Sequence, residues 1–309
     1  MIGLDQLVPV ILTVITASTP LLFAALGELV TEKSGVLNLG VEGMMVIGAL
    51  AAFAVTSVSG SATLGIAAGA LAGAGLALIF AFLTLTMLAN QVATGLALTI
   101  FGVGLSALAG TGFVGVALSP LQKLDIPGLS SIPVLGPLIF NQDMLVYLSF
   151  AMVAGVYWFL TATRPGLILR AVGVSHASAH AIGLPVILTR YLATLFGGLM
   201  SGLGGAYLSL SYTPMWAENM TAGRGWIALA LVVFSTWRPG RLLAGAYLFG
   251  FITVVQLHAQ GAGFAVPSQV MSMLPYLATI LVLVLISRDK IKIMQNAPAS
   301  LGKPFHSAK

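Results

Sequence analysis

Charged residues are scarce in this chain. Asp, Glu, Lys and Arg make up 7% of its 309 residues, and none of the 80 residues between Glu42 and Lys123 is charged. Because a water-soluble domain needs charged side chains on its surface, this absence excludes a soluble fold. A bilayer crossing takes about 20 mostly apolar residues, so the uncharged stretch alone has room for about three crossings.

Cysteine and nucleotide-binding motifs are absent as well. Without cysteine the chain forms no disulfide and has no thiolate nucleophile. It contains no G-x-x-x-x-G-K-[ST] run, so it has no P-loop for ATP. We therefore expect a non-enzyme with no catalytic residues. The chain has a net charge of +5, and its Lys and Arg residues are concentrated in a few loops. This distribution is typical of a membrane protein whose positive loops set its orientation, rather than of a protein that binds nucleic acid.

Apolar runs alternate with short polar patches along the whole chain. Since backbone polar groups in hydrocarbon must be hydrogen-bonded internally, these runs predict helices. The predicted fold class is all-α, a polytopic membrane protein with about 8–10 transmembrane helices. Of the spans, 43–58 and 225–237 are short enough to be half-helices or broken helices. The predicted spans are 6–26, 43–58, 62–88, 92–112, 143–162, 188–211, 225–237, 242–258 and 270–287.

The predicted domain organisation is a single transmembrane domain over 1–309 with two pseudo-repeated halves. The proposed parts are a first half over 1–112, an external loop over 113–142, a second half over 143–287 and a cytoplasmic tail over 288–309. Clusters of Lys and Arg at 164–190, 238–241 and 288–292 fall on one face, which the positive-inside rule makes cytoplasmic. The N-terminus is then outside.

Glycine-rich segments occur at matching places in the two halves. Residues 35–43 lead into a helix of small residues, and residues 221–226 do the same later in the chain. Such interruptions point to a binding site at the membrane midplane of a transporter. The alternative is that glycine is simply common in membrane helices. Glycines at 65, 69 and 73 predict close helix packing, within the chain or between subunits.

Polar residues near these segments are candidates for a solute path. The functional interpretation is a polar lining that hydrogen-bonds a hydrophilic solute, and the alternative is capping of helix ends. Arg224 either touches the solute or anchors a helix end. Glu32 and Lys33 are expected to form a local ion pair. The candidate path residues are Asn38, Glu42, Asn90, Gln91, Arg224 and Trp226.

The cytoplasmic loop over 164–188 contains signals for a short helix. Ser175 is a good N-cap, 176–182 can form two turns, and Gly183 with Pro185 ends them. His176 and His180 at i, i+4 could ligate a metal, but no third ligand is near and no metal site is expected. A docking element for a cytoplasmic partner is the preferred interpretation.

These motifs resemble those of a known family. Residues 27–43 read GELVTEKSGVLNLGVEG, and residues 221–230 read TAGRGWIALA, followed by Trp237-Arg238-Pro239. Both resemble signatures of the ribose/branched-chain amino-acid superfamily of ABC importer permeases, in its nucleoside branch. Residues 170–173 resemble the opening of that family's coupling loop. The family continues with Gly-Glu-Asn-Pro, whereas this chain reads Gly-Val-Ser-His at 173–176, so its docking details differ.

The resemblance covers residues 20–290 and implies a nucleoside importer driven by alternating access. It implies a bacterial inner-membrane location and four companions: a second homologous permease, a cytoplasmic ABC ATPase that binds ATP and magnesium, an extracytoplasmic solute-binding protein, and membrane lipid. No cofactor is expected on this chain. A sugar or branched-chain amino-acid permease, or a stand-alone proton-coupled transporter, are the alternatives. The implied ATPase-coupling residues are Arg170, Gly173, Ser175, His176, His180 and Gly183.

Overall fold

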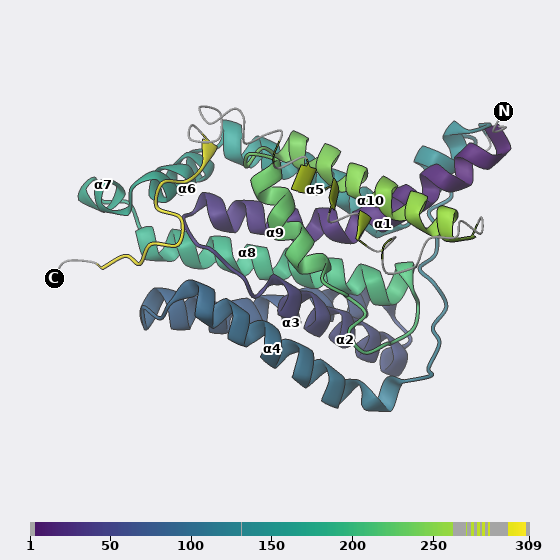
Figure 1. The fold of residues 1–309 in the computed structure, drawn as a ribbon, viewed down its shortest axis with the longest axis horizontal. Helices are drawn as coiled ribbons and strands as arrows, with labels where there is room; N and C mark the ends of the chain where they lie inside the picture. The colour runs from purple at the N-terminus through teal and green to yellow at the C-terminus, as the bar shows by residue number, and fades with distance from the viewer. Residues whose placement is uncertain are drawn as a thin grey trace.

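The fold is a bundle of long helices (Figure 1). This computed structural model describes residues 4–130, 132–261 and 296–306, with isolated positions between 270 and 284. Within these ranges there is no regular strand, only three isolated bridges. The helices are α1 Leu4–Lys33, α2 Val41–Ser59, α3 Ala62–Ala81, α4 Gln91–Gly110, α5 Met144–Ala162, α6 Arg164–Val174, α7 His176–Ala181, α8 Val186–Tyr207, α9 Arg224–Phe234 and α10 Pro239–Gly261.

Seven of these helices are long and apolar enough to cross a membrane, which confirms the all-α polytopic class. They are α1 to α5, α8 and α10, with α3 and α8 extended by the π-helical turns 82–86 and 208–212. The segment predicted at 43–58 is a full helix of 19 residues. The segment predicted at 225–237 is short, since α9 has 11 residues. The span predicted at 270–287 lies outside the continuously described residues.

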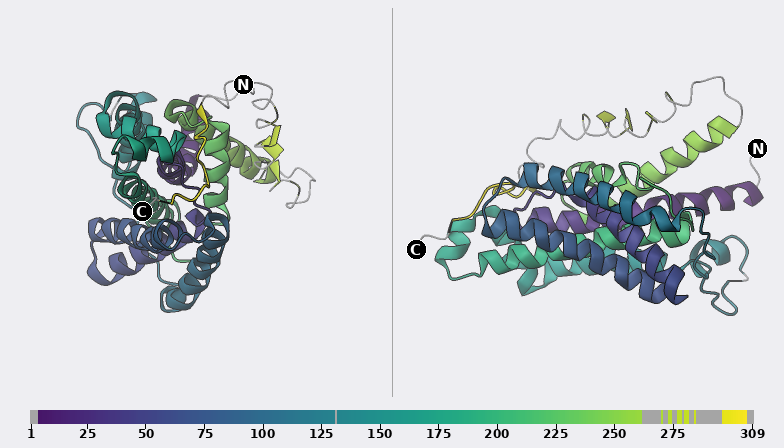
Figure 2. Two further views of the ribbon diagram at one scale, coloured as in Figure 1. Left: turned by 90° about the vertical axis from the view of Figure 1, so that its left-hand side faces the viewer. Right: turned by 90° about the horizontal axis from the view of Figure 1, so that it is seen from below.

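The centre of the bundle is formed by α1 and α8. Seen along the bundle, α1 lies between a group formed by α2 to α4, a second group containing α5 to α7, and α9 with α10 (Figure 2, left). Its middle turns have no exposed surface, because neighbours cover every side. The fully buried residues of these turns include Leu22, Phe23, Ala24, Ala25 and Leu26.

Close glycine packing joins α3 to the centre. A Cβ atom placed on Gly73 would lie 2.3 Å from the carbonyl oxygen of Gly198 and 2.8 Å from the Cα atom of Gly202. A Cβ on Gly69 would lie 2.7 Å from the carbonyl oxygen of Gly48. Only a residue without a side chain lets the backbones approach this far. The glycine ridge predicted from the sequence therefore packs inside the chain.

The two ends of the bundle differ. The N-terminus and the end of α10 lie at one end, whereas α6, α7 and the C-terminus lie at the other (Figure 1). Among its described residues, the long connection at 114–142 has no helix long enough to span a membrane, and its one helical turn is the π-helical Gly136–Phe140. It is tied to the end of α8, where the Leu121 N–H donates to the Leu210 carbonyl at 3.2 Å.

Candidate functional site

Both glycine-rich segments lead to helix starts inside the bundle. Residues 34–40 run back from the end of α1 to the start of α2, and residues 213–223 run from the end of α8 to the start of α9 (Figure 1). The two starts touch, because a Cβ placed on Gly225 would lie 2.6 Å from the Cα of Glu42. We call residues 35–43 and 221–226 together the glycine junction.

Glu42 holds the glycine junction together by capping α9. Its Oε1 accepts from the Thr221 hydroxyl at 2.5 Å and the Gly223 N–H at 2.8 Å, and its Oε2 accepts from the Gly225 N–H at 2.6 Å. The N-cap of α9 is Gly223, at φ +81°, which has no side chain to do this. A buried carboxylate at a helix N-terminus satisfies the free N–H groups and opposes the positive end of the helix dipole.

The first half of the junction is held by amide side chains and by α4. The Asn38 Oδ1 accepts from the Gly40 N–H at 2.9 Å, and the Gln91 Oε1 accepts from the Leu37 N–H at 2.8 Å. Asn90 caps α4 by accepting from the Ala93 N–H at 3.0 Å. Asn38, Glu42, Asn90 and Gln91 thus all bind backbone groups, as the capping alternative requires. Their contact with a solute stays a prediction.

Some buried polar atoms beside the junction have no hydrogen-bond partner in the described structure. They include the Oε2 of Glu28 and the Nε2 of Gln91. The other oxygen of Glu28 accepts from the Asn38 N–H at 3.1 Å. Glu28 was not among the predicted path residues, although the polar cluster around the first glycine segment includes it. A buried polar atom without a partner is costly, so each would be stabilised by a water or ligand.

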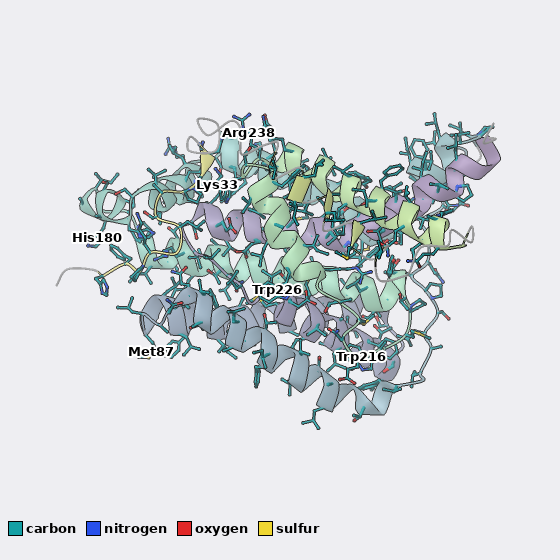
Figure 3. All side chains as sticks on the ribbon, viewed as in Figure 1. Lys33, Met87, His180, Trp216, Trp226 and Arg238 are labelled. Carbon is teal, nitrogen blue, oxygen red and sulfur yellow. The ribbon has the colours of Figure 1, made fainter. Side chains whose placement is uncertain are left out.

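Arg224 and Trp226 open α9. The Arg224 guanidinium donates to the Met220 carbonyl at 3.1 Å and lies 5.2 Å from the centre of the Tyr212 ring. These contacts are those of a helix-end anchor, which is one of the two roles left open for Arg224. Trp226 is 36% exposed and lies in the middle of the bundle's length (Figure 3). Solute contact by either residue stays a prediction.

The expected ion pair between Glu32 and Lys33 is wrong. The Glu32 Oε2 instead accepts from the Trp237 Nε1 at 2.6 Å, and the Lys33 Nζ donates to the Asn296 carbonyl at 2.7 Å. Neighbouring residues of a helix point in different directions and do not face each other. The two side chains therefore bind different parts of the chain.

The short helix predicted in the loop over 164–188 is present. The Ser175 hydroxyl accepts from the Ser178 N–H at 3.2 Å and caps α7, and Gly183 ends the turn at φ +81°. The preceding helix α6 was not predicted. Its signal is the pair Thr163 and Pro165, since the Thr163 hydroxyl caps the first turn and proline is favoured at a helix start. Gly173 fits against the Lys33 carbonyl, where a Cβ would lie 2.0 Å away.

The two histidines of α7 share an aromatic neighbour. The rings of His176 and His180 lie 5.8 Å and 5.4 Å from the ring of Phe305, in edge-to-face orientations. His176 is buried, whereas His180 is exposed. Burial, with the charges of Arg190 and Lys303, lowers the pKa of His176 to about 4. His176 is therefore neutral at physiological pH.

Arg170 belongs to a group of cations at this end of the bundle. It lies close enough to Lys33 for their charges to repel, as does Arg238 (Figure 3 labels Lys33 and Arg238). Sequence analysis missed Arg190, which is 2% exposed and contacts both the first glycine segment and the C-terminal residues. Its one sign in the sequence is a lone charge in the first turns of an apolar span.

An apolar cavity near α6 is separate from the glycine junction. It has a volume of about 550 Å³ and lies between α1, α5, α6 and α8. Thr189 is the one hydroxyl residue among its lining residues, and that hydroxyl already donates to the Pro185 carbonyl at 2.8 Å. A hydrophilic solute would find few hydrogen-bond partners there.

Sequence comparison agrees with this arrangement. Residues 10–285 match the family described as the permease component of the branched-chain amino acid transport system. The chain belongs to this family. It is thus a permease component of the ABC-transporter class, with several membrane-spanning helices and homologues that are transport subunits rather than enzymes.

Relatives from several organisms match over most of the chain. A putative glucose ABC transporter permease of Haloferax volcanii is 42% identical and aligns over 87% of this chain and 88% of its own. The guanosine ABC transporter permease of Bacillus subtilis is 31% identical and aligns over 97% of this chain and 98% of its own. The nucleoside ABC transporter permease of Lactococcus lactis is 33% identical and aligns over 87% of this chain and 89% of its own.

Proposed function

We propose that this permease is the membrane-spanning subunit of an ATP-driven importer of nucleosides. The observation that carries the proposal is the pair of relatives named for guanosine and nucleoside transport, which align over 97% and 87% of the chain. The form of the second glycine signature, Thr221 to Trp226 followed by Trp237, supports the same branch. The chain would act with a second permease, an ABC ATPase and a solute-binding protein in the bacterial cytoplasmic membrane.

The glycine junction is the proposed centre of movement. Two helix starts meet there in close backbone contact at Gly225, and they are joined chiefly by the Glu42 carboxylate. Since α2 and α9 each begin inside the bundle, a tilt of either helix opens or closes a path at this depth. The carboxylate offsets the positive helix end, so the surroundings suit an uncharged, hydroxyl-rich solute.

The cytoplasmic element α6 and α7 is the proposed contact with the ATPase. ATP and magnesium would bind on that partner and supply the energy. The exposed face of α7 presents His180, and Ile182 directly after the helix is 74% exposed. In the proposed complex, Ile182 would bury this apolar surface against the ATPase, which favours association. Arg170, Gly173 and Ser175 position this helix, through α6 and the N-cap.

Import of a simple sugar is the second candidate. The glucose permease relative from Haloferax volcanii has higher identity, 42%, than either nucleoside relative. A branched-chain amino acid is a third solute class, which the family description names. A ribonucleoside carries a sugar, so both solutes offer hydroxyl groups to the same polar atoms.

A binding test separates these solutes. The solute-binding protein that works with this permease would be heated with guanosine, adenosine, ribose, glucose or leucine, and its melting temperature recorded. We expect nucleosides to raise the melting temperature by several degrees and free sugars to leave it unchanged. A shift with glucose or ribose alone would replace nucleosides by sugars as the proposed solute.

A further inference from the structure

The last described residues return to the membrane domain and bind it at several points. We call residues 296–306 the C-terminal strap. Its Ser300 N–H donates to the Gly173 carbonyl at 3.0 Å, and the Ser300 hydroxyl donates to the Val174 carbonyl at 3.1 Å. Its Gly302 N–H donates to the Gly35 carbonyl at 3.2 Å. Ser300 itself is buried, at 6% exposure.

The strap joins three elements that are distant in the sequence. Ser300 binds the end of α6, Gly302 binds the first residues of the segment between α1 and α2, and Phe305 lies against the two histidines of α7. Figure 1 shows the strap in yellow passing the ends of α6, α7 and α8. A mere solvated tail would not bury a serine or give its backbone N–H groups to helix ends.

Arg190, in the first turns of α8, binds the strap. Its guanidinium donates to the Gly35 carbonyl at 3.0 Å and to the Lys303 carbonyl at 3.1 Å. A buried cation must be held by acceptors, because burial without them costs several kcal/mol. Arg190 therefore holds the strap and the glycine segment together at the start of α8.

The segment beyond Gly35 is short, and it is hydrogen-bonded along its length up to the start of α2. Leu37 is bound by Gln91, Asn38 by Glu28, and Gly40 by Asn38. Five residues separate Gly35 from Val41, where α2 begins. His176 also lies against this point, since a Cβ on Gly35 would be 2.8 Å from its Nε2.

We propose that the C-terminal strap, through Phe305 and Arg190, makes α7 and the segment at Gly35 move together. Motion of α7 would then reach the glycine junction. Arg190 and Phe305 are positioning residues in this account, and neither touches solute or nucleotide. The inference rests on the proposed ATP-driven transport. A two-state element biased from both of its ends is the physical requirement for such coupling.

Cysteine accessibility tests whether the strap is docked. The chain has no native cysteine, so Ser300→Cys places a single thiol in the strap, and Ala177→Cys places one on the exposed face of α7. We expect a hydrophilic maleimide to label position 300 at least tenfold more slowly than position 177. Adding Phe305→Ala should remove most of that protection, whereas adding His306→Ala, its exposed neighbour, should not. Equal labelling of the two thiols in the parent chain would overturn the proposal.

Transport stoichiometry tests whether docking matters. The full complex in proteoliposomes would be compared as parent, Phe305→Ala, His306→Ala, Phe305→Tyr and a chain that ends after Pro298. We expect uptake per ATP hydrolysed to fall about fivefold or more for Phe305→Ala and the shortened chain. His306→Ala should match the parent, and Phe305→Tyr should restore coupling because it keeps the ring.

The outcomes separate this inference from the proposed function. Unchanged uptake per ATP in a Phe305→Ala complex whose Ser300→Cys thiol has become accessible would overturn the strap's role and leave the importer intact. A parent complex that takes up solute without ATP would overturn the proposed function, while protection of position 300 would still show a docked strap.

Discussion

The glycine junction and the end of the bundle that holds α6 and α7, here called the α7 end, are built from different interactions. At the junction, one carboxylate accepts hydrogen bonds from two backbone N–H groups at the start of α9, up to 183 positions away, and from a hydroxyl beside them. At the α7 end, the strap binds backbone carbonyls and packs one ring against two histidines. The first region depends on a buried charge and on missing side chains. The second depends on a chain end that has to dock.

Because of this difference, we expect the two regions to tolerate substitutions to different degrees. Loss of the Glu42 carboxylate leaves buried N–H groups without an acceptor. A methyl group added at Gly225 clashes with the backbone of Glu42. No local movement relieves either defect. Loss of a strap contact exposes a short segment to water, which can hydrogen-bond its backbone. We therefore expect changes at the junction to affect folding and changes at the α7 end to affect coupling.

The largest effect is expected for Gly225→Ala. The new methyl group would lie 2.6 Å from both the Cα and the N atom of Glu42. Overpacking against backbone should lower the free energy of unfolding by about 3 kcal/mol. Yield of monodisperse protein and its melting temperature would measure this. Gly104→Ala in α4 is the matched control, because nothing lies within 4 Å of its Cβ position; a similar loss there would refute the close contact.

Glu42→Gln should have the next largest effect. The variant keeps one oxygen, but its NH₂ group cannot accept from the second backbone N–H, and the charge at the start of α9 is lost. We expect a loss of about 2 kcal/mol in the free energy of unfolding. Glu218→Gln, on an exposed residue of the same connection, is the control and should behave like the parent. Equal stability of the two variants would mean that Glu42 does not cap α9.

A pH-dependent effect on stability is expected at the α7 end. The pKa of His176 in the folded chain is about 4, below its ordinary value of 6.5, because burial and nearby cations disfavour its charged form. As pH falls from 6.5 towards 4, the unfolded chain binds the proton first, so His176 makes the folded form less stable across this window. The stability that neutral His176 gives to the folded form is therefore fully present above pH 6.5 and is lost below about pH 4.

The measurement is the melting temperature of the parent, His176→Gln and His180→Gln between about pH 7 and pH 5. We expect the parent and His180→Gln to lose about 2–4 °C more over this range than His176→Gln does. His180 is the matched control because it is exposed and lies against the same Phe305 ring. Parallel curves for all three proteins would contradict the buried, neutral state of His176.

The smallest effect is expected for Asn90→Ala. Asn90 is exposed and caps α4 with one hydrogen bond of 3.0 Å to the Ala93 N–H. Loss of such a cap costs about 1 kcal/mol. Ser61→Ala removes the equivalent cap of α3 and should have a similar effect on melting temperature. If Asn90→Ala alone abolished uptake without changing stability, Asn90 would belong to the solute path rather than to helix capping.

Local patterns in the sequence predicted much of the fold. Hydropathy found the long spans, and the cap at Ser175 with the stop at Gly183 found α7, because these signals lie within a few residues of one another. The glycine segments predicted where two helices are interrupted. Helix α6 was not predicted, because its 11 residues mix charged and apolar side chains and hydropathy therefore gives no span there.

Long-range partners were beyond the sequence patterns. Glu42 was a candidate, but nothing near it indicates that its partners are Thr221, Gly223 and Gly225. Likewise, no pattern around Lys33 indicates the Asn296 carbonyl, 263 residues away. Such pairs are set by the tertiary fold, so the sequence predicted the polar residues but not what they bind.

The most direct test of this account is uptake by the reconstituted importer. Proteoliposomes would contain this permease, its partner permease and the ABC ATPase, with the solute-binding protein and radiolabelled guanosine on the outer side and ATP or a non-hydrolysable analogue within. We predict uptake that needs ATP hydrolysis, the binding protein and this chain together. Uptake of guanosine by this chain alone, driven by a proton gradient without ATP, would contradict the account.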